Sequence, residues 1–334
     1  MRRFAALVAM LSLLVAAPAA SARSWADAQI RAAVASGLMG PSVVAFRPSA
    51  TLTRADLARI VTGITHRERM VAYPERPVTM TGLNRALVAA LGLAPAARAI
   101  RGELAQADLT PPARAGWETV ARLLQLRFNH PAPNDGRERL PTDPATRAEA
   151  AYSVARILEL SSWELERAKD AARSFDLPPL SAWQARVLRR SVRFIGFPYI
   201  WGGTSEYRET LFGVTSRGGF DCSGFVWRVY KLERWGEAPR LNSVLRGRTT
   251  FQMAGEMPRA ARLPRSRLRP ADVVFFGSRG VASTPAEVTH MGISVGGGWF
   301  MHSSSQGTTL APLEGWYATT FAWGRRPLAE AGLS

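Results

Sequence analysis

The sequence predicts an α+β fold in which a helical first part precedes a helix that packs on an antiparallel sheet. Apolar residues with helical spacing dominate up to about residue 160, whereas short apolar segments separated by turn signals follow residue 270 or so. Between these parts an apolar helix begins at Cys222, the only cysteine of the 334-residue chain. Helices followed by strands in this order are typical of α+β proteins.

The first 22 residues have the pattern of a signal peptide. Arg2 and Arg3 form a basic start, an apolar stretch too short to span a bilayer follows, and Ala20-Ser21-Ala22 provides an A-x-A cleavage site. We expect cleavage after Ala22, and the flanking residues fit Sec export better than twin-arginine export. The mature protein is expected to be secreted or in the cell wall, without a transmembrane segment. A lone cysteine cannot form an internal disulfide there, so it is expected to do chemistry.

The chain is strongly basic, with a formal charge of +17 that falls to +15 once Arg2 and Arg3 are removed. Such a charge attracts polyanions. Export excludes nucleic acid as the partner, and anionic cell-wall polysaccharide takes its place. The alternative is that the excess of arginine reflects the codon usage of a GC-rich genome, since Lys169 and Lys231 are the only lysines. A composition of 47% apolar and 21% charged residues predicts a folded chain.

Residues 23–160 are expected to be all-α, with a loose repeat of three modules. Thr53 with Asp56, and Thr146 with Glu149, have the spacing of a capping box at a helix start. A third helix start lies at 78–84.

The phrases Thr53-Arg54-Ala55-Asp56 and Thr146-Arg147-Ala148-Glu149, with Phe46-Arg47-Pro48 before the first, resemble S-layer homology modules. The resemblance implies binding of wall polysaccharide, with Arg54 and Arg147 as the binding arginines and a degenerate middle module at 82–84. The alternative is that the threonines and acids only cap helices while the arginines are solvated surface.

Residues 161–184 are charged and favour a helix, and the segment contains Leu177-Pro178-Pro179-Leu180. We expect a linker here and a second domain over 185–334. An amphipathic helix is predicted for 184–194, followed by a loop and the cysteine helix. Strands are predicted at 272–276, 290–295, 299–302 and 321–325.

Cys222 is the candidate nucleophile, because a thiolate attacks carbonyl carbon readily. A lowered thiol pKa is needed for the thiolate to be present at neutral pH. Two devices in the sequence lower a thiol pKa: the start of a helix, here behind the potential N-cap Asp221, and an imidazole. His66 and His130 belong to the first part, which leaves His290 and His302.

His290 and His302 flank the turn signal Gly296-Gly297-Gly298. A hairpin folded about Gly296 places the two histidines opposite each other, and one folded about Gly297 makes them diagonal neighbours on the same face. We assign His290 as the base and His302 as the residue that orients it. The alternative is that both are ordinary core histidines.

Four segments, in this order, resemble the motifs of the NlpC family of papain-like cell-wall endopeptidases. They are Pro198-Tyr199-Ile200-Trp201-Gly202-Gly203, Phe220-Asp221-Cys222-Ser223-Gly224-Phe225-Val226, Pro270-Ala271-Asp272-Val273-Val274-Phe275-Phe276, and His290-Met291-Gly292-Ile293 with Met301-His302. The resemblance implies a papain-like fold, the triad Cys222, His290 and His302, and substrate-binding roles for Tyr199, Asp221 and Ser223. It also implies hydrolysis of the γ-D-glutamyl to diamino-acid bond in peptidoglycan stem peptides.

Three positions depart from the family pattern, with Ala271, Ser294 and Ser303 in place of the usual Gly, Tyr and Ala, and the loop 204–219 is longer than usual. Arg248-Thr249-Thr250 resembles another family segment near the cleft. Because the triad lies entirely after residue 181, residues 181–334 alone are expected to cleave soluble muropeptides.

Other readings of the same residues remain open. Cys222, His290 and His302 are possible zinc ligands, but no paired Cys or His spacing supports a metal, and neither a metal nor another cofactor is expected. A thiol acyltransferase or amidase on the same fold would share the acyl-enzyme and differ only in the acceptor. A wall-binding protein with an inactive hydrolase domain is the third alternative.

Overall fold

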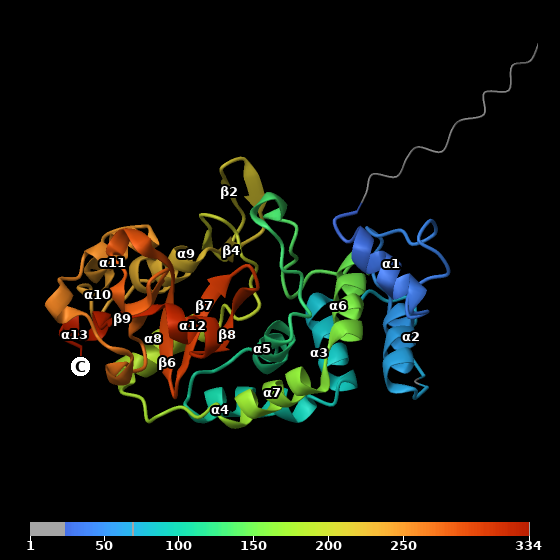
Figure 1. Cartoon of the computed structure of the whole chain (residues 1–334), viewed down its shortest axis with the longest axis horizontal. Helices are drawn as coiled ribbons and strands as arrows, with labels where there is room; N and C mark the ends of the chain where they lie inside the picture. Colours follow the sequence, from blue (N-terminus) through green and yellow to red (C-terminus); the bar gives the residue numbers. More distant parts are fainter. Residues whose placement is uncertain (1–23, 69, 334) are drawn as a thin grey trace, which may run out of the picture.

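The computed structural model of the protein describes residues 24–68 and 70–333. The predicted signal peptide, 1–22, lies outside the described residues. Within those residues, none of the helices has the length and apolar character needed to cross a membrane. Helices of the first part lie at one end of an elongated molecule and the sheet lies at the other (Figure 1), which agrees with the predicted α+β class.

Six helices form most of the first part, and three of them begin at threonine caps, of which Thr53 and Thr146 were predicted. The side chains of Thr53, Thr79 and Thr146 each accept a hydrogen bond from the backbone N–H three residues further on. The helices are α1 (Asp27–Ala35), α2 (Arg54–Thr65), α3 (Met80–Ala90), α4 (Ala94–Gln106), α5 (Ala115–Leu123) and α6 (Arg147–Glu159).

The segments that precede α2, α3 and α6 form a closed ring of backbone hydrogen bonds. The N–H of Leu52 donates to Ala145 O (2.8 Å), that of Ala145 to Val78 O (2.8 Å), and that of Val78 to Leu52 O (3.0 Å). Each segment therefore donates one backbone hydrogen bond and accepts one within the ring, so the three segments are arranged with approximate threefold symmetry. The repeat in the sequence thus corresponds to three equivalent helix starts around one axis.

The segment assigned to a linker is part of the fold. Its helix α7 (Ser162–Arg173) packs on α4, and Ala168 and Ala172 are buried. The N–H of Leu177 donates to Glu103 Oε1 at 2.9 Å. The prediction of a linker over 161–184 was therefore wrong. The buried face of α7 consists largely of alanines, which give a weak apolar signal beside many charged residues. Helix α8 (Ala182–Val192) follows.

Five antiparallel strands form the sheet of the second part, in the order β8-β7-β6-β5-β9. The strands are β5 (Val273–Gly277), β6 (Val288–Gly296), β7 (Trp299–Ser304), β8 (Gly307–Pro312) and β9 (Phe321–Arg325). Four were predicted from the sequence. The missed strand, β8, has two threonines and ends in proline, which is tolerated at the edge of a sheet.

One face of the sheet packs against the helix that carries Cys222, α9 (Cys222–Trp227), and the other bears a smaller apolar cluster that includes Phe276 and Phe300. The remaining α-helices and strands are β1 (Thr204–Ser205), β2 (Glu209–Leu211), β3 (Val214–Ser216), β4 (Gly219–Phe220), α10 (Leu241–Val244), α11 (Thr250–Gly255), α12 (Gly315–Thr320) and α13 (Pro327–Glu330). The long loop 204–219 thus forms two short strand pairs.

A buried ionic cluster joins the two parts. Arg122 on α5 is fully buried and donates to Glu138 Oε1 and to the carbonyl of Gly196, both at 2.9 Å. Arg127 donates to the same Glu138 oxygen, also at 2.9 Å, and Glu118 lies 3.4 Å from Arg122 Nε. Helix α5 also packs directly on β8. The two parts therefore share one interior.

Ala271, one of the three departures from the family pattern, has a φ of 68°. This left-handed conformation costs an alanine roughly 1–2 kcal/mol and costs glycine little. The residue is buried, and its carbonyl accepts a hydrogen bond from the Tyr230 hydroxyl. This positive φ explains why glycine is the usual residue at this position, since glycine adopts it without strain.

Candidate active site

Cys222 is the first residue of α9, and Asp221 caps that helix as predicted. The Asp221 carboxylate accepts hydrogen bonds from the N–H of Gly224 and, at 2.9 Å, from the N–H of Gly202. The Ser223 hydroxyl donates to Asp221 Oδ1 at 3.0 Å. These bonds hold the loop that ends at Gly202 against the start of the helix.

Gly224 lets the helix start lie directly on this loop. A Cβ at Gly224 would stand 1.8 Å from the carbonyl oxygen of Gly203. A real contact that short does not occur, so a larger residue must push α9 and the loop apart. Glycine at this position fixes where Cys222 lies.

We expect Gly224→Ala to lower the free energy of unfolding by roughly 1–3 kcal/mol, because the added methyl overpacks a rigid backbone contact. It should also reduce activity, since Cys222 moves with the helix. Gly236→Ala is the control, because an added Cβ there meets no described atom within 4 Å. Thermal unfolding measures both variants, and equal stability would refute the packing argument.

The thiol of Cys222 is buried and lies beside strand β6. The backbone N–H groups of Ser223 and Met291 donate to the sulfur, and the Thr250 hydroxyl is 3.5 Å from Sγ. Met291 directly follows His290, so the thiol adjoins the strand segment that carries the candidate base.

Burial raises the pKa of the Cys222 thiol to about 11, and the Asp221 carboxylate acts in the same direction. The two backbone N–H groups and Thr250 lower the pKa but do not offset burial. The expectation of a lowered thiol pKa was therefore wrong. The helix start acts as expected, but the thiol lies deeper than the sequence indicates.

His290 and His302 lie together on one face of the sheet. His302 pairs with Gly292 across β6 and β7, which is the register of a hairpin folded about Gly297. His290 Nε2 is 2.9 Å from His302 Nδ1, and the two rings are nearly perpendicular, at 86°. One of these nitrogens carries a hydrogen and donates a hydrogen bond to the other.

Aromatic residues pack around the histidine pair, in which His302 is buried and His290 is half-buried. The rings of Phe276 and Tyr317 lie 5.7 and 6.1 Å from that of His290, between centroids. Burial lowers the pKa of His290 to about 4 and that of His302 well below its ordinary value, and the nearby His290 lowers the latter further. Both imidazoles are therefore neutral at pH 7.

The other ring nitrogen of His302, Nε2, is buried and has no hydrogen-bond partner among the described residues. His302 lines a cavity of about 660 Å³ together with Trp316 and Tyr317 of α12 and with residues of α7. Helix α7 and the end of α5 thus contribute one wall of a cavity that reaches His302.

Tyr199 is half-buried, and burial raises its pKa, with the nearby charges of Cys222, Asp221 and Asp135 acting in the same direction. It therefore lies close to the thiol.

Asp221 and Ser223 are both buried, and their side chains are engaged with backbone groups and with Arg248, whose Nη1 donates to Ser223 Oγ at 2.7 Å. Arg54 and Arg147 are the first residues of α2 and α6, in the first part, and no described contact joins them to this site.

Two residues of the site were not singled out in the sequence. Asp135 belongs to the first part, yet its Oδ2 accepts the N–H of Trp201 at 2.8 Å. Tyr317 packs on both histidines. The aromatic pair Trp316-Tyr317 was visible in the sequence, whereas nothing near Asp135 indicates this contact. In the described ranges, no three His, Cys, Asp or Glu side chains are grouped so as to hold a metal ion.

Residues 196–326 match the model of the NlpC/P60 family. The chain is 26% identical over 125 residues to the γ-D-glutamyl-L-lysine dipeptidyl-peptidase of Bacillus subtilis, covering 37% of this chain and 33% of that protein. It is 33% identical over 124 residues to the murein DD-endopeptidase MepH of Escherichia coli, covering 37% of each. The crystal structure of an NlpC/P60 family protein from Bacillus cereus aligns with a TM-score of 0.33 and 23% identity, over 46% of this chain and 43% of that one.

The aligned segment spans about a third of the length of these two curated relatives. It contains the cysteine helix and the strands that carry both histidines. Residues 196–326 are therefore similar to the NlpC/P60 family.

Proposed function

We propose that the protein is an exported cell-wall hydrolase, a cysteine endopeptidase that cleaves peptidoglycan stem peptides. The observation that carries the proposal is a buried thiol at a helix start beside the strand of a hydrogen-bonded histidine pair. The similarity of residues 196–326 to the NlpC/P60 family and the endopeptidase names of similar proteins support hydrolase activity. The signal-peptide pattern of 1–22 supports export.

In the proposed mechanism the thiol and the imidazole are both neutral before reaction, because burial disfavours both charges. Sγ of Cys222 attacks the amide carbon while its proton passes to Nδ1 of His290. Nε2–H of His290 donates to His302 Nδ1, so His302 fixes the tautomer and orients the ring. His290 then protonates the leaving amine, and water hydrolyses the thioester, which releases the acid and restores the thiol.

The proposed scissile bond is the γ-D-glutamyl to diamino-acid bond, in line with the name of the Bacillus subtilis relative, a γ-D-glutamyl-L-lysine dipeptidyl-peptidase. Mass spectrometry of wall fragments after incubation with the mature chain tests this bond. A fragment that ends in a free γ-carboxylate supports hydrolysis there. Transfer of the acyl group to an added amine in place of water would instead favour the acyltransferase alternative.

The two histidine roles predict an order of activities. His302→Gln should retain more activity than His290→Gln, because an amide can hydrogen-bond to a ring but cannot transfer a proton. Initial rates of dipeptide release measure both variants, with thermal unfolding as the check on folding. The reverse order would mean that His302 is the base.

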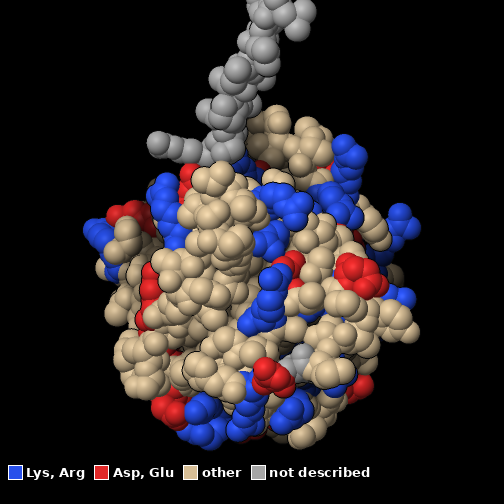
Figure 2. Space-filling model, turned by 90° about the vertical axis from the view of Figure 1, so that its right-hand side faces the viewer, with Lys and Arg blue, Asp and Glu red and all other residues tan. Residues whose placement is uncertain are grey.

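We further propose that the first part binds cell-wall polysaccharide through its S-layer-like modules. The ring of three equivalent helix starts supports a modular repeat. Basic side chains are spread over the end of the molecule that carries α1 and α2, with fewer acidic ones among them (Figure 2). Arg54 is exposed, whereas Arg147 donates to Phe46 O and pairs with Asp56 at 2.9 Å, and it lines a cavity with Asp56.

Salt separates specific binding from general attraction, because the Debye length falls from about 10 Å at 0.1 M to about 3 Å at 1 M. Cosedimentation of the Cys222→Ala protein with bacterial walls should persist in part at 1 M salt. Changing Arg54 and Arg147 together to Gln in this protein should remove the binding that persists at 1 M salt. The comparison holds if the proteins with and without the two changes unfold at the same temperature. Complete loss of wild-type binding at high salt would refute specific recognition.

A further inference from the structure

Four arginines converge on a cavity of about 560 Å³ between the two parts of the chain. Arg137 and Arg139 come from the segment that precedes α6, and Arg208 and Arg217 come from the long loop 204–219. The two segments are in contact, since a Cβ at Gly136 would lie 3.1 Å from the Val214 side chain. In Figure 1, β2 of the loop stands beside the green segment that leads to α6. We call this cavity the arginine pocket.

The charges of the arginine pocket are not balanced by the protein. Arg217 pairs with Asp143, and the other acidic residue of the lining, Glu138, is already engaged with Arg122 and Arg127. Within residues 24–68 and 70–333, no carboxylate lies within ion-pair distance of Arg137, Arg139 or Arg208. Arg137, Arg208 and Arg217 are exposed and Arg139 is half-buried, so the pocket is a solvent-facing cavity with an excess of positive charge. The pocket therefore favours a negatively charged ligand.

A buried hydroxyl in the same pocket also lacks a partner. Ser216 on β3 is 3% exposed, it lines the pocket, and its Oγ has no hydrogen-bond partner among the described residues. A buried polar group without a partner costs free energy, which a ligand oxygen would recover. The hydroxyl is an observation independent of the arginines, and it indicates a ligand with oxygen acceptors.

The arginine pocket adjoins the candidate active site through one strand-like segment. Ile200 lines the pocket, and its neighbour Tyr199 lies close enough to Cys222 for the thiolate charge to act on its hydroxyl. The other neighbour, Trp201, donates its N–H to Asp135 of the first part. The lining of the pocket therefore includes the residue next to the tyrosine that lies close to the thiol.

We propose that the arginine pocket binds a free carboxylate of the stem peptide whose cleavage is proposed above. Guanidinium groups bind carboxylates through paired charge-assisted hydrogen bonds, and several arginines around one anion add specificity. Stem peptides carry carboxylates at their acidic and diamino-acid residues and at the C-terminus. The pocket then selects peptides with a free carboxylate over those in which it is amidated.

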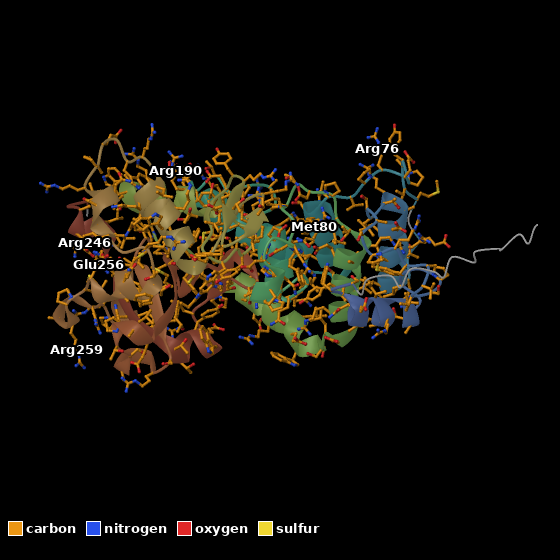
Figure 3. The ribbon with its side chains drawn as sticks, turned by 90° about the horizontal axis from the view of Figure 1, so that it is seen from above. Arg76, Met80, Arg190, Arg246, Glu256 and Arg259 are labelled. Atoms are coloured by element: carbon orange, nitrogen blue, oxygen red, sulfur yellow. The ribbon has the colours of Figure 1, made fainter. Side chains whose placement is uncertain are left out.

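The test is the binding of a stem tetrapeptide, with free or amidated carboxylates, to the mature Cys222→Ala chain by calorimetry. Arg208→Gln should weaken binding of the free peptide about tenfold or more and leave the amidated peptide unaffected. Arg259→Gln is the matched control: it removes the same charge from an exposed site at the far end of the second part (Figure 3) and should change neither. Ser216→Ala should have a smaller effect in the same direction as Arg208→Gln.

In the active protein the Arg208→Gln change should raise KM for the free-carboxylate peptide and leave kcat unchanged, because Arg208 does not touch the reacting atoms. Equal binding of free and amidated peptides would overturn the proposal. So would equal effects of Arg208→Gln and Arg259→Gln. Inorganic phosphate that competes with the free peptide supports an oxyanion site. A phosphate polymer that binds in an Arg208-dependent way, while amidation has no effect, would overturn the assignment to the substrate.

The binding readout does not depend on catalysis. If the Cys222→Ala chain discriminates free from amidated peptide but the wild-type chain cleaves neither, the proposed function fails while the carboxylate site stands. If cleavage occurs without discrimination, the site fails and the function stands.

Discussion

Cys222→Ala is expected to lower the rate of stem-peptide cleavage by at least about 10⁴-fold, the largest effect of any single change. The substitution removes the only thiol of the chain. Neither Ser223 nor Thr250 is expected to replace it, because Ser223 is held by Asp221 and Arg248, and an aliphatic hydroxyl is a far weaker nucleophile than a thiol. Release of peptide fragments, followed by mass spectrometry, measures the loss.

The fold should survive this change. Alanine is a good helix former, and the sulfur contributes little beyond its contacts with Thr250 and the two backbone N–H groups. The unfolding temperature should therefore change by only a few degrees, and the variant should still bind stem peptides. Undiminished cleavage by a folded Cys222→Ala protein would refute the enzyme proposal. A collapse of stability would leave Cys222→Ser as the variant to compare.

Local patterns explain why much of the second part could be predicted. The turn at Gly296–Gly298 and the period of two along β6 and β7 are enough to bring His290 and His302 to one face. The cap at Asp221 and the apolar run after it are enough to place Cys222 at a helix start. Each of these inferences uses residues close together in the sequence, where turn and helix chemistry decide the outcome.

Features that depend on distant residues could not be predicted. The thiol pKa is set by how deeply α9 lies against β6, which no local pattern contains. Asp135 reaches Trp201 across 66 positions of sequence. The repeat of helix starts was recognisable from its capping threonines, but the ring that joins Leu52, Val78 and Ala145 needs all three segments at once.

The ionic cluster between the two parts leads to the second large effect. Arg122→Met should lower the free energy of unfolding by about 3–5 kcal/mol, because it leaves Glu118 and Glu138 buried with one fewer positive charge. For a chain of this size the unfolding temperature should fall by roughly 5–10 °C. Arg101→Met on α4 is the matched control, since Arg101 is exposed and should cost little.

The same cluster revises the expectation that residues 181–334 act alone. Arg122 lies between the backbone of Gly196 and that of Gly307, where an added Cβ would stand 2.1 Å from Nη1. Arg114 donates to the carbonyls of Ile195 and Arg193, both at 2.7 Å. Removing the first part would expose these backbone groups and the apolar contact of α5 with β8.

We therefore expect the fragment 181–334 to be less stable than the full chain and to cleave stem peptides more slowly even where it is folded. The second effect follows because Asp135 no longer holds the Trp201 backbone next to Tyr199. Circular dichroism separates the two effects, since it reports the folded fraction for which the rate must be corrected. A folded fragment with the full rate would show that the first part serves attachment alone. In that case Arg122→Met would lower stability without changing the rate per folded molecule.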